Sequence, residues 1–279
     1  MEGEDFDKIL GRLDELELTT VNGRITETVG MLIKAIVPQV KIGEVCLVKR
    51  EGEPLRTEVV GFTRDEVFLS PLGEMKGIGP SSEVIPTHLP LHIKVGDQLL
   101  GRILNGLGEP LDEDTKGPLE CDHIKSVLAP PPDPLKRERI LEPMSTGVRA
   151  IDGMLTVGRG QRVGVFAAAG GGKSTLLGMI ARYSQADVNV ISLIGERGRE
   201  LRDFIERELG PEGLKKSVLV ISTSDQASQL RLNAAYVGTA IAEYFRDQGK
   251  NVCFMMDSVT RFARALREVG LAAGEPPAR

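Results

Sequence analysis

The chain has 279 residues, of which 41% are hydrophobic and 27% are charged. At about 150 residues per domain, this length suggests roughly two domains with real apolar cores, which excludes an intrinsically disordered chain. Lys and Arg number 35 against 40 Asp and Glu, and this net charge of −5 disfavours a protein that grips nucleic acid through its phosphates. The acidic N-terminus lacks the features of a signal peptide, and no apolar run approaches about 18 residues, so we expect a soluble cytoplasmic protein.

Residues 1–18 carry apolar side chains at helical spacing, with charged residues between them: Phe6, Ile9, Leu10, Leu13 and Leu16. The spacing predicts an N-terminal amphipathic helix. Two roles stay open for it, packing on its own domain or docking on a partner or a membrane surface. The acidic polar face argues against a surface of anionic lipid.

Residues 19–96 contain short β-branched runs at 23–26, 44–48, 57–62 and 66–69, separated by Gly, Pro and Asp. Strands this short suit a small antiparallel barrel that closes on itself. Residues 97–144 are rich in Gly and Pro, and the run 130–134 cannot continue a helix or a central strand. We expect this segment to be a connector wrapped on the surface.

Residues 145–279 alternate apolar strands and helices. The strands are expected at 162–166, 188–194, 218–222 and 251–256, and the helices end near 183, 209, 248 and 269. This alternation predicts an α/β domain, a parallel sheet covered on both faces.

A glycine loop follows the first of these strands. The candidate phosphate-binding residues are Ala169, Gly170, Gly171, Gly172, Lys173, Ser174 and Thr175. Strand, glycine loop and helix is the context of a P-loop, in which backbone N–H groups and the helix N-terminus bind phosphate. Lys173 would reach the β and γ phosphates of ATP, and the Ser174 hydroxyl would bind Mg²⁺. Ala167 replaces the first glycine of the usual pattern, and a simple flexible turn is the alternative interpretation.

Glu196 and Arg197 follow the second strand, at the edge where a parallel sheet binds its ligand. Glu196 is the candidate for polarising the attacking water, and Arg197 for spreading the charge on the γ-phosphate. The alternative is an acidic residue placed at a helix N-terminus.

Asp257 ends the apolar strand 251–256, which is the Walker B arrangement, and it would hold Mg²⁺ together with Ser174. The alternative is an N-cap for the helix over 259–269. Arg261, Arg264 and Arg267 repeat on that helix and are interpreted as a solvated or subunit-facing stripe.

With these motifs placed, the sequence resembles the ATPases of type III protein secretion, injectisome and flagellar alike, which are related to the catalytic β subunit of ATP synthase. The most specific stretches are LGEPLD at 107–112, STGVRAID at 145–152, GRGQR at 158–162, IGERGRE at 194–200, DSVTR at 257–261 and LAAGEPP at 271–277.

The resemblance implies a small β-barrel before an incomplete RecA-like P-loop core, and Mg²⁺-dependent ATP hydrolysis in a homohexamer. It implies that this energy releases chaperones from exported proteins and unfolds them. It also implies a central stalk, a stator-like regulator, chaperone–cargo complexes, and a peripheral location at the inner face of the cytoplasmic membrane, without nucleic acid. By the same resemblance, Lys173, Ser174, Glu196, Arg197 and Asp257 take the phosphate, magnesium, water-activating, γ-phosphate and metal roles.

Members of this family continue beyond the segment that matches residues 274–279, with an arginine finger and an adenine-stacking aromatic. We therefore expect the chain to be a fragment with weak or no hydrolysis. Two other functions are alternatives for this sequence. A Rho-like RNA helicase would need basic and aromatic residues on its barrel, where only Phe62 and Phe68 occur among many acids. A non-catalytic assembly subunit would be expected to have lost Lys173, Glu196 or Asp257, and all three are present; for a fragment, a binding-only role stays open.

Overall fold

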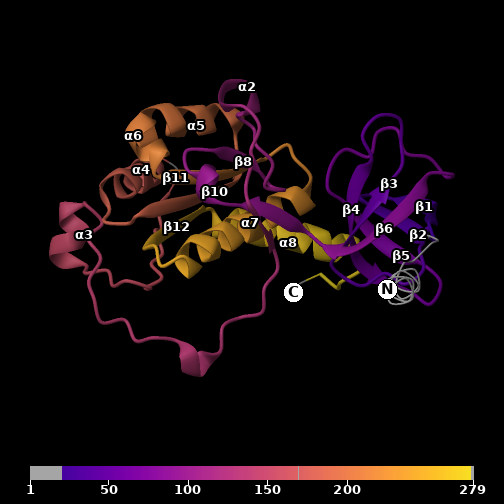
Figure 1. The fold of residues 1–279 in the computed structure, drawn as a ribbon, viewed down its shortest axis with the longest axis horizontal. Coiled ribbons are helices and arrows are strands. Elements are labelled where there is room, and N and C mark those ends of the chain that lie inside the picture. Colours follow the sequence, from indigo (N-terminus) through magenta and orange to yellow (C-terminus); the bar gives the residue numbers. More distant parts are fainter. Residues whose placement is uncertain (1–20, 169, 278–279) are drawn as a thin grey trace, which may run out of the picture.

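The computed structural model describes residues 21–168 and 170–277, so the predicted helix at 1–18 lies outside the described residues (Figure 1). The chain begins with a closed antiparallel barrel in the strand order β1-β2-β5-β4-β3-β6. Its strands are β1 (Gly23–Val29), β2 (Leu32–Ile36), β3 (Glu44–Val48), β4 (Leu55–Phe62), β5 (Val67–Pro71) and β6 (Glu83–Pro90). The predicted barrel is confirmed.

Alternation of inward and outward side chains fills the barrel with a core of its own, which includes Ile33, Val48 and Leu69. The two strands that the sequence pattern did not indicate are β2 and β6, and β6 contains Pro86 and Pro90, residues that normally argue against a strand. The barrel closes where β1 meets β6, through the pairs Gly23↔Val84 and Arg24↔Glu83.

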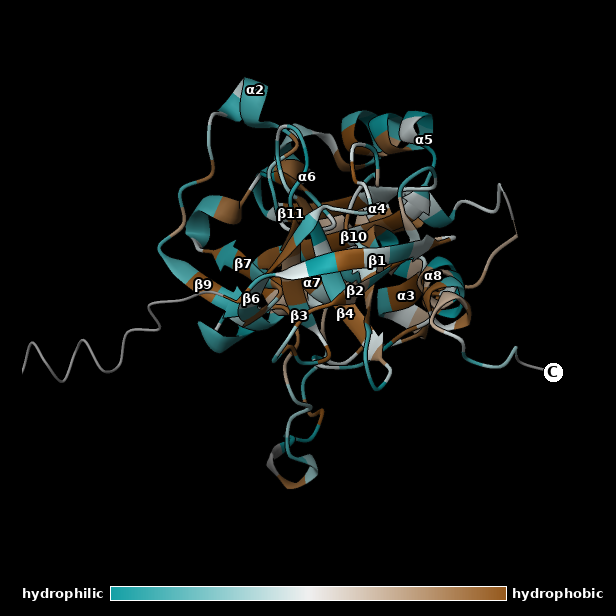
Figure 2. Ribbon diagram, turned by 90° about the vertical axis from the view of Figure 1, so that its right-hand side faces the viewer, coloured by the Kyte–Doolittle hydropathy of each residue, from teal (hydrophilic) through white to brown (hydrophobic). Residues whose placement is uncertain are grey.

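The second body is built on a four-stranded parallel sheet in the order β12-β10-β11-β8. Its strands are β8 (Ile103–Asn105), β10 (Val188–Glu196), β11 (Ser217–Thr223) and β12 (Val252–Asp257). The strands β10 and β11 are almost wholly buried and read as apolar runs, as expected when helices cover both faces (Figure 2).

Helices cover both faces of this sheet. On one face α7 (Ser228–Asp247) packs with α8 (Val259–Ala272), and on the other lie α4 (Lys173–Tyr183), α5 (Gly198–Asp203) and the π-helical turn η3 (Phe204–Leu209). Shorter elements complete the body: α2 (Glu113–Lys116), α3 (Arg149–Met154), α6 (Gly210–Lys215), η1 (Asp97–Leu99) and η2 (Pro134–Lys136). The predicted α/β architecture is confirmed. Among the residues that the structure describes, no helix combines the length and apolar composition needed to cross a bilayer.

Two expectations about this body are wrong. The connector does not lie wholly on the surface, because β8 belongs to the sheet and Leu104 is fully buried there. The β-ribbon of β7 (His92–Val95) and β9 (His123–Ser126) also draws it inward against the core. The connector is so rich in Gly and Pro that its sequence pattern did not indicate β8, a strand of three residues.

The segment 162–166, expected as the strand before the glycine loop, forms no strand. Its Phe166 is 96% exposed, and Val163 is exposed as well. A strand exists through its ladder of backbone hydrogen bonds, and within the described part of the chain this segment has no partner strand. Its apolar residues are consequently left on the surface.

The barrel rests on the N-terminal end of α7 through buried polar contacts. Gln229 Nε2 donates a hydrogen bond of 2.8 Å to Glu58 Oε2, and Asn233 Nδ2 reaches the same oxygen at 3.5 Å. The Ser70 hydroxyl lies 3.3 Å from Gln229 Oε1. Burial raises the pKa of the Glu58 carboxyl, although the Gln229 and Asn233 amides act in the opposite direction. These contacts fix the barrel against the sheet body.

Candidate functional site

The glycine loop leads directly into α4, which begins at Lys173. Gly170 and Gly172 have φ values of 77° and 80°, a left-handed conformation that L side chains rarely adopt. The loop therefore turns at two positions that favour glycine, and α4 starts with its N-terminal N–H groups at the loop. Ala169, which was predicted to bind phosphate, lies outside the described residues.

Lys173 and Asp257 meet across the site. The Lys173 ammonium lies 2.5 Å from Asp257 Oδ1, at the end of β12. Asp257 is only 4% exposed, so its negative charge needs a partner of this kind. The carboxylate is not the N-cap of α8, since the cap is Ser258, whose hydroxyl accepts from the Arg261 N–H at 3.4 Å. The structure thus brings together the two residues that were assigned to phosphate and metal.

Ser174 and Thr175 follow Lys173 on the first turn of α4, and both residues are exposed. The Thr175 hydroxyl donates a hydrogen bond of 2.8 Å to Glu208 Oε1 on η3. The Thr175 hydroxyl therefore joins α4 to the neighbouring π-helical turn. Ser174 lies between Thr175 and Lys173 in the sequence.

Glu196 lies at the end of β10, and its partner is Arg261. The Arg261 Nη1 atom lies 2.6 Å from Glu196 Oε1, and the Glu196 side chain is 14% exposed. Burial raises the pKa of Glu196, with Arg261 opposing this effect and the carboxyl of Glu200 and the charge of Asp257 adding to it. A carboxylate whose pKa is raised is the better proton acceptor near neutral pH.

Arg197 points elsewhere. Its Nη1 atom donates a hydrogen bond of 3.0 Å to Glu200 Oε1, and its side chain is 66% exposed. The Glu200 pKa is lowered by its contact with the Glu196 carboxyl and by Arg197. Although Arg197 directly follows Glu196 in the sequence, its side chain pairs with Glu200, and Glu196 pairs with Arg261.

Arg261 is the residue at this edge of the sheet that the sequence interpretation missed. The repeat with Arg264 and Arg267 indicates a solvated or subunit-facing stripe, and the solvated interpretation is wrong for Arg261, which contacts Glu196. Arg264 and Arg267 are exposed. The available signal was position: Arg261 lies on the first turn of α8, four residues after Asp257, so it starts at the same edge of the sheet.

The oxygen donors at this edge suit Mg²⁺. That ion keeps several waters and binds one or two carboxylates together with substrate phosphates. Asp257 supplies one buried carboxylate and Ser174 one hydroxyl, which is such a partial set. In the described ranges no group of three or more His, Cys, Asp or Glu side chains gathers to hold a metal alone.

The motif at 145–152 is held together by the carboxylate of Asp152. Asp152 accepts hydrogen bonds from the N–H and the hydroxyl of Thr146, from the Ser145 hydroxyl and from the Gly147 N–H, at 2.7 to 3.0 Å. These donors, the Thr146 hydroxyl first, lower the pKa of Asp152 to about 2. Asp152 is therefore the anchor of the turn that precedes α3.

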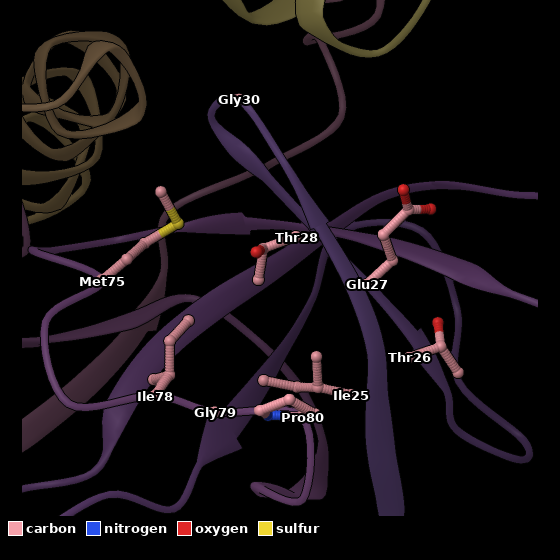
Figure 3. A pocket seen from close by; sticks show the side chains of 9 residues that line it. All are labelled: Ile25, Thr26, Glu27, Thr28, Gly30, Met75, Ile78, Gly79 and Pro80. Carbon is pink, nitrogen blue, oxygen red and sulfur yellow. The ribbon is translucent and has the colours of Figure 1, made fainter.

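A cavity of about 280 Å³ lies in the barrel, between β1 and the loop that carries Met75 and Ile78 (Figure 3). Figure 3 shows threonine, methionine and isoleucine side chains around it and one carboxylate, that of Glu27. None of the described residues that line this cavity is cationic, whereas cations are the groups that bind phosphate most strongly. The candidate site remains the edge formed by Lys173, Glu196 and Asp257.

Comparisons with known proteins agree with this geometry. The nucleotide-binding domain of the ATP synthase alpha/beta family matches residues 147–279, and the β-barrel domain of the same family matches residues 25–88. A type 3 secretion system ATPase of Xanthomonas euvesicatoria is 58% identical over 259 residues, which are 92% of this chain. A flagellum-specific ATP synthase of Bacillus subtilis is 52% identical over 260 residues, 91% of this chain. The chain spans 58% of the length of each of these two relatives.

A solved structure shows the same fold. The assembled ATPase EscN from the type III secretion system of enteropathogenic E. coli superposes with a TM-score of 0.84 at 48% identity, over 92% of this chain and 61% of that one. EscN in complex with its central stalk EscO gives a TM-score of 0.85, over 92% of this chain and 62% of that one. Two domain matches in the same order, close relatives and a shared fold lead to one conclusion: the chain belongs to the ATP synthase alpha/beta family, in which it resembles the ATPases of type III secretion and flagellar export.

Proposed function

We propose that this chain is the barrel and nucleotide-binding part of an ATPase whose hydrolysis of ATP drives protein export through a type III secretion apparatus. The observation that carries the proposal is the 2.5 Å contact between Lys173 and Asp257, with Glu196 held by Arg261 at the same edge of the sheet. A P-loop lysine, a Walker B carboxylate and a second buried carboxylate are the parts that γ-phosphate hydrolysis needs.

The proposed mechanism uses residues of this chain in named roles. Lys173 exchanges Asp257 for the β and γ phosphates, and the N–H groups of the loop from Ala169 to Thr175 surround the phosphate oxygens. Asp257 and Ser174 would hold Mg²⁺, which neutralises phosphate charge when bound. Glu196 orients the attacking water and accepts its proton.

Arg197 keeps the role of spreading charge on the γ-phosphate. Its ion pair with Glu200 is exposed on both sides, and such pairs contribute about 0 to 1 kcal/mol, which is weak enough to be exchanged for a phosphate. The arginine finger and the adenine-stacking aromatic that the family resemblance implies are expected in the length that the relatives have beyond this match.

The partners and the domain division remain part of the proposal. We assign residues 1–18 to an N-terminal helix, 19–96 to the barrel, 97–144 to a connector and 145–279 to the ATPase core. A homohexamer around a central stalk is supported by the assembled EscN and its complex with EscO. A stator-like regulator, chaperone–cargo complexes and a place at the inner face of the cytoplasmic membrane follow from the family resemblance alone. Relatives of both the injectisome and the flagellar kind match, and none that is described here is a helicase.

Nucleotide binding by this chain is the direct test, since binding depends on the glycine loop that the chain contains. A fluorescent ATP analogue with Mg²⁺ should bind the wild type and the Glu196→Gln variant, and should bind Lys173→Ala at least about tenfold more weakly. Lys215→Ala is the matched control, an exposed lysine on α6 that pairs with Glu212. Equal binding by Lys173→Ala and the wild type would overturn the proposal, and turnover retained in Glu196→Gln would remove Glu196 from it.

A further inference from the structure

Gly195 interrupts the end of β10. The parallel ladder pairs Ile194 with Ser222, but the next pair is Glu196 with Thr223, so Gly195 is an extra residue in the ladder. Its φ of 69° is left-handed. A bulge of this kind re-aims the side chain that follows it. The direction of the Glu196 side chain is therefore set by the conformation of Gly195.

The same glycine lies under the side chain of Arg261. A Cβ atom added at Gly195 would lie 2.9 Å from Arg261 Cδ and 3.4 Å from Arg261 Cβ. Carbon atoms pack at about 3.5 to 4.0 Å, so the Arg261 side chain would have to move. In its present position, the Arg261 guanidinium lies 2.6 Å from Glu196 Oε1. The space left by the missing side chain is what allows this reach.

We propose that Gly195 is a positioning residue for Glu196, acting through Arg261, an inference that rests on the ATPase function proposed above. The bulge turns the Glu196 carboxylate toward α8, and the bare backbone of Gly195 lets the Arg261 stem lie across β10 to hold it. Any side chain at residue 195 separates the two charges. Lys173 and Asp257 come from α4 and β12, so the parts that bind the nucleotide phosphates stay in place.

Gly195→Ala, made in a protein that contains this chain and hydrolyses ATP, tests this inference through the separation of kcat from KM. We expect kcat to fall about 10- to 100-fold, the scale of a misplacement near 1 Å, with KM and the affinity for the fluorescent nucleotide within about twofold of wild type. An unchanged kcat would overturn the inference. A loss of affinity as large as the loss of kcat would also overturn it, since it would place Gly195 in nucleotide binding.

Two other glycines serve as controls. Gly198→Ala changes the first residue of α5, three positions further along the chain, where no heavy atom lies within 4 Å and φ is not left-handed. Gly249→Ala introduces the same left-handed strain, with φ of 78°, at an open position after α7. Both should keep the wild-type kcat. Gly195→Asn separates contact from strain, because Asn tolerates the left-handed region better than Ala but still has a Cβ. It should lose as much kcat as Gly195→Ala, and recovery in Gly195→Asn would show that strain alone is responsible.

A double-mutant cycle measures the coupling between residue 195 and Arg261 without requiring ATP turnover. Urea unfolding is compared for Gly195→Ala in the wild type and in Arg261→Ala, which lacks the Cγ and Cδ atoms over the glycine. The cost of Gly195→Ala should be smaller in the Arg261→Ala background. Additive costs would overturn the inference even if the chain binds no nucleotide. Conversely, a coupled cycle in a chain that binds no nucleotide would refute the proposed function and leave the Gly195–Arg261 contact standing.

Discussion

The ammonium of Lys173 lies 2.5 Å from the carboxylate of Asp257 and thereby joins the first turn of α4 to the last residue of β12. The two side chains come from positions 84 residues apart in the sequence. This ion pair links the start of α4, directly after the glycine loop, to the strand that ends in the Walker B carboxylate.

Removing one partner of this pair should cost more than removing both. Lys173→Ala leaves a buried carboxylate without its cation and should lower the free energy of unfolding by about 1 to 3 kcal/mol. The double change Lys173→Met with Asp257→Leu should recover most of that loss. Urea denaturation at pH 7 measures both, with Lys215→Ala as the exposed control. A double variant that is less stable than Lys173→Ala would contradict this account.

Two helical glycines should respond to alanine with opposite signs. A Cβ at Gly178, inside α4, would lie 2.7 Å from the carbonyl oxygen of Glu208, so Gly178→Ala forces α4 away from η3 and should destabilise the protein by about 1 to 3 kcal/mol. A Cβ at Gly153, in α3, meets no atom within 4 Å, and Gly153→Ala should stabilise by about 0.5 to 1 kcal/mol. Thermal unfolding of the two variants decides it, and the same sign for both would show that the α4–η3 contact is looser than described.

The barrel contact should make stability depend on pH through Glu58. A carboxyl whose pKa is higher in the folded chain takes up a proton on folding, so it penalises folding at neutral pH and the penalty shrinks as the pH falls through that raised value. Glu58→Gln removes the titration and keeps an oxygen for Gln229. We expect Glu58→Gln to gain stability over wild type at pH 7.5, and to lose that advantage toward pH 4.5. Urea midpoints across this range measure it.

The control for Glu58 is Glu51→Gln, the same change of charge in an exposed turn of the barrel. It should show no comparable trend with pH. A stability difference between wild type and Glu58→Gln that stays constant from pH 4.5 to 7.5 would mean that Glu58 is not held at the interface as the structure places it.

Asp152 should show the opposite dependence. Its pKa is lowered to about 2 by the donors of Ser145, Thr146 and Gly147, so the stability it supplies is present above the unfolded value, near 3.8, and is lost as the pH falls toward 2. Asp152→Asn should be less stable than wild type at pH 7, and the gap should close between pH 4 and pH 2. Unfolding followed by circular dichroism measures the gap, and a gap that widens in acid would refute the role of Asp152 as the anchor of its turn.

Local patterns in the sequence were enough for much of this architecture. Alternating short runs indicated the barrel, and the apolar run ending in Asp257 indicated a strand with a functional carboxylate, because both signals lie within a few residues. The spacing of Arg261 from Asp257 places it at this edge of the sheet, but its contact with Glu196 depends on how α8 docks on the sheet, which the spacing does not specify. The segment 162–166 shows the opposite outcome. Its apolar run predicts a strand, but a strand also needs a neighbouring strand to pair with, and the run alone does not supply one.

The ladder between β1 and β6, which closes the barrel, determines where the barrel is expected to open first. Among the described residues, two residue pairs join β1 to β6, whereas the other ladders of the barrel have between three and five. Because the ladder between β1 and β6 has the fewest pairs, we expect the barrel to open there first. Opening would leave a curved ribbon of six strands with β1 and β6 as its edges. The cavity of Figure 3 borders that seam, beside residues 25–28. The amide proton of Ile25, which donates a hydrogen bond of 3.2 Å to the Ser82 carbonyl across that seam, should then exchange with solvent before those of β4, in the middle of the ribbon.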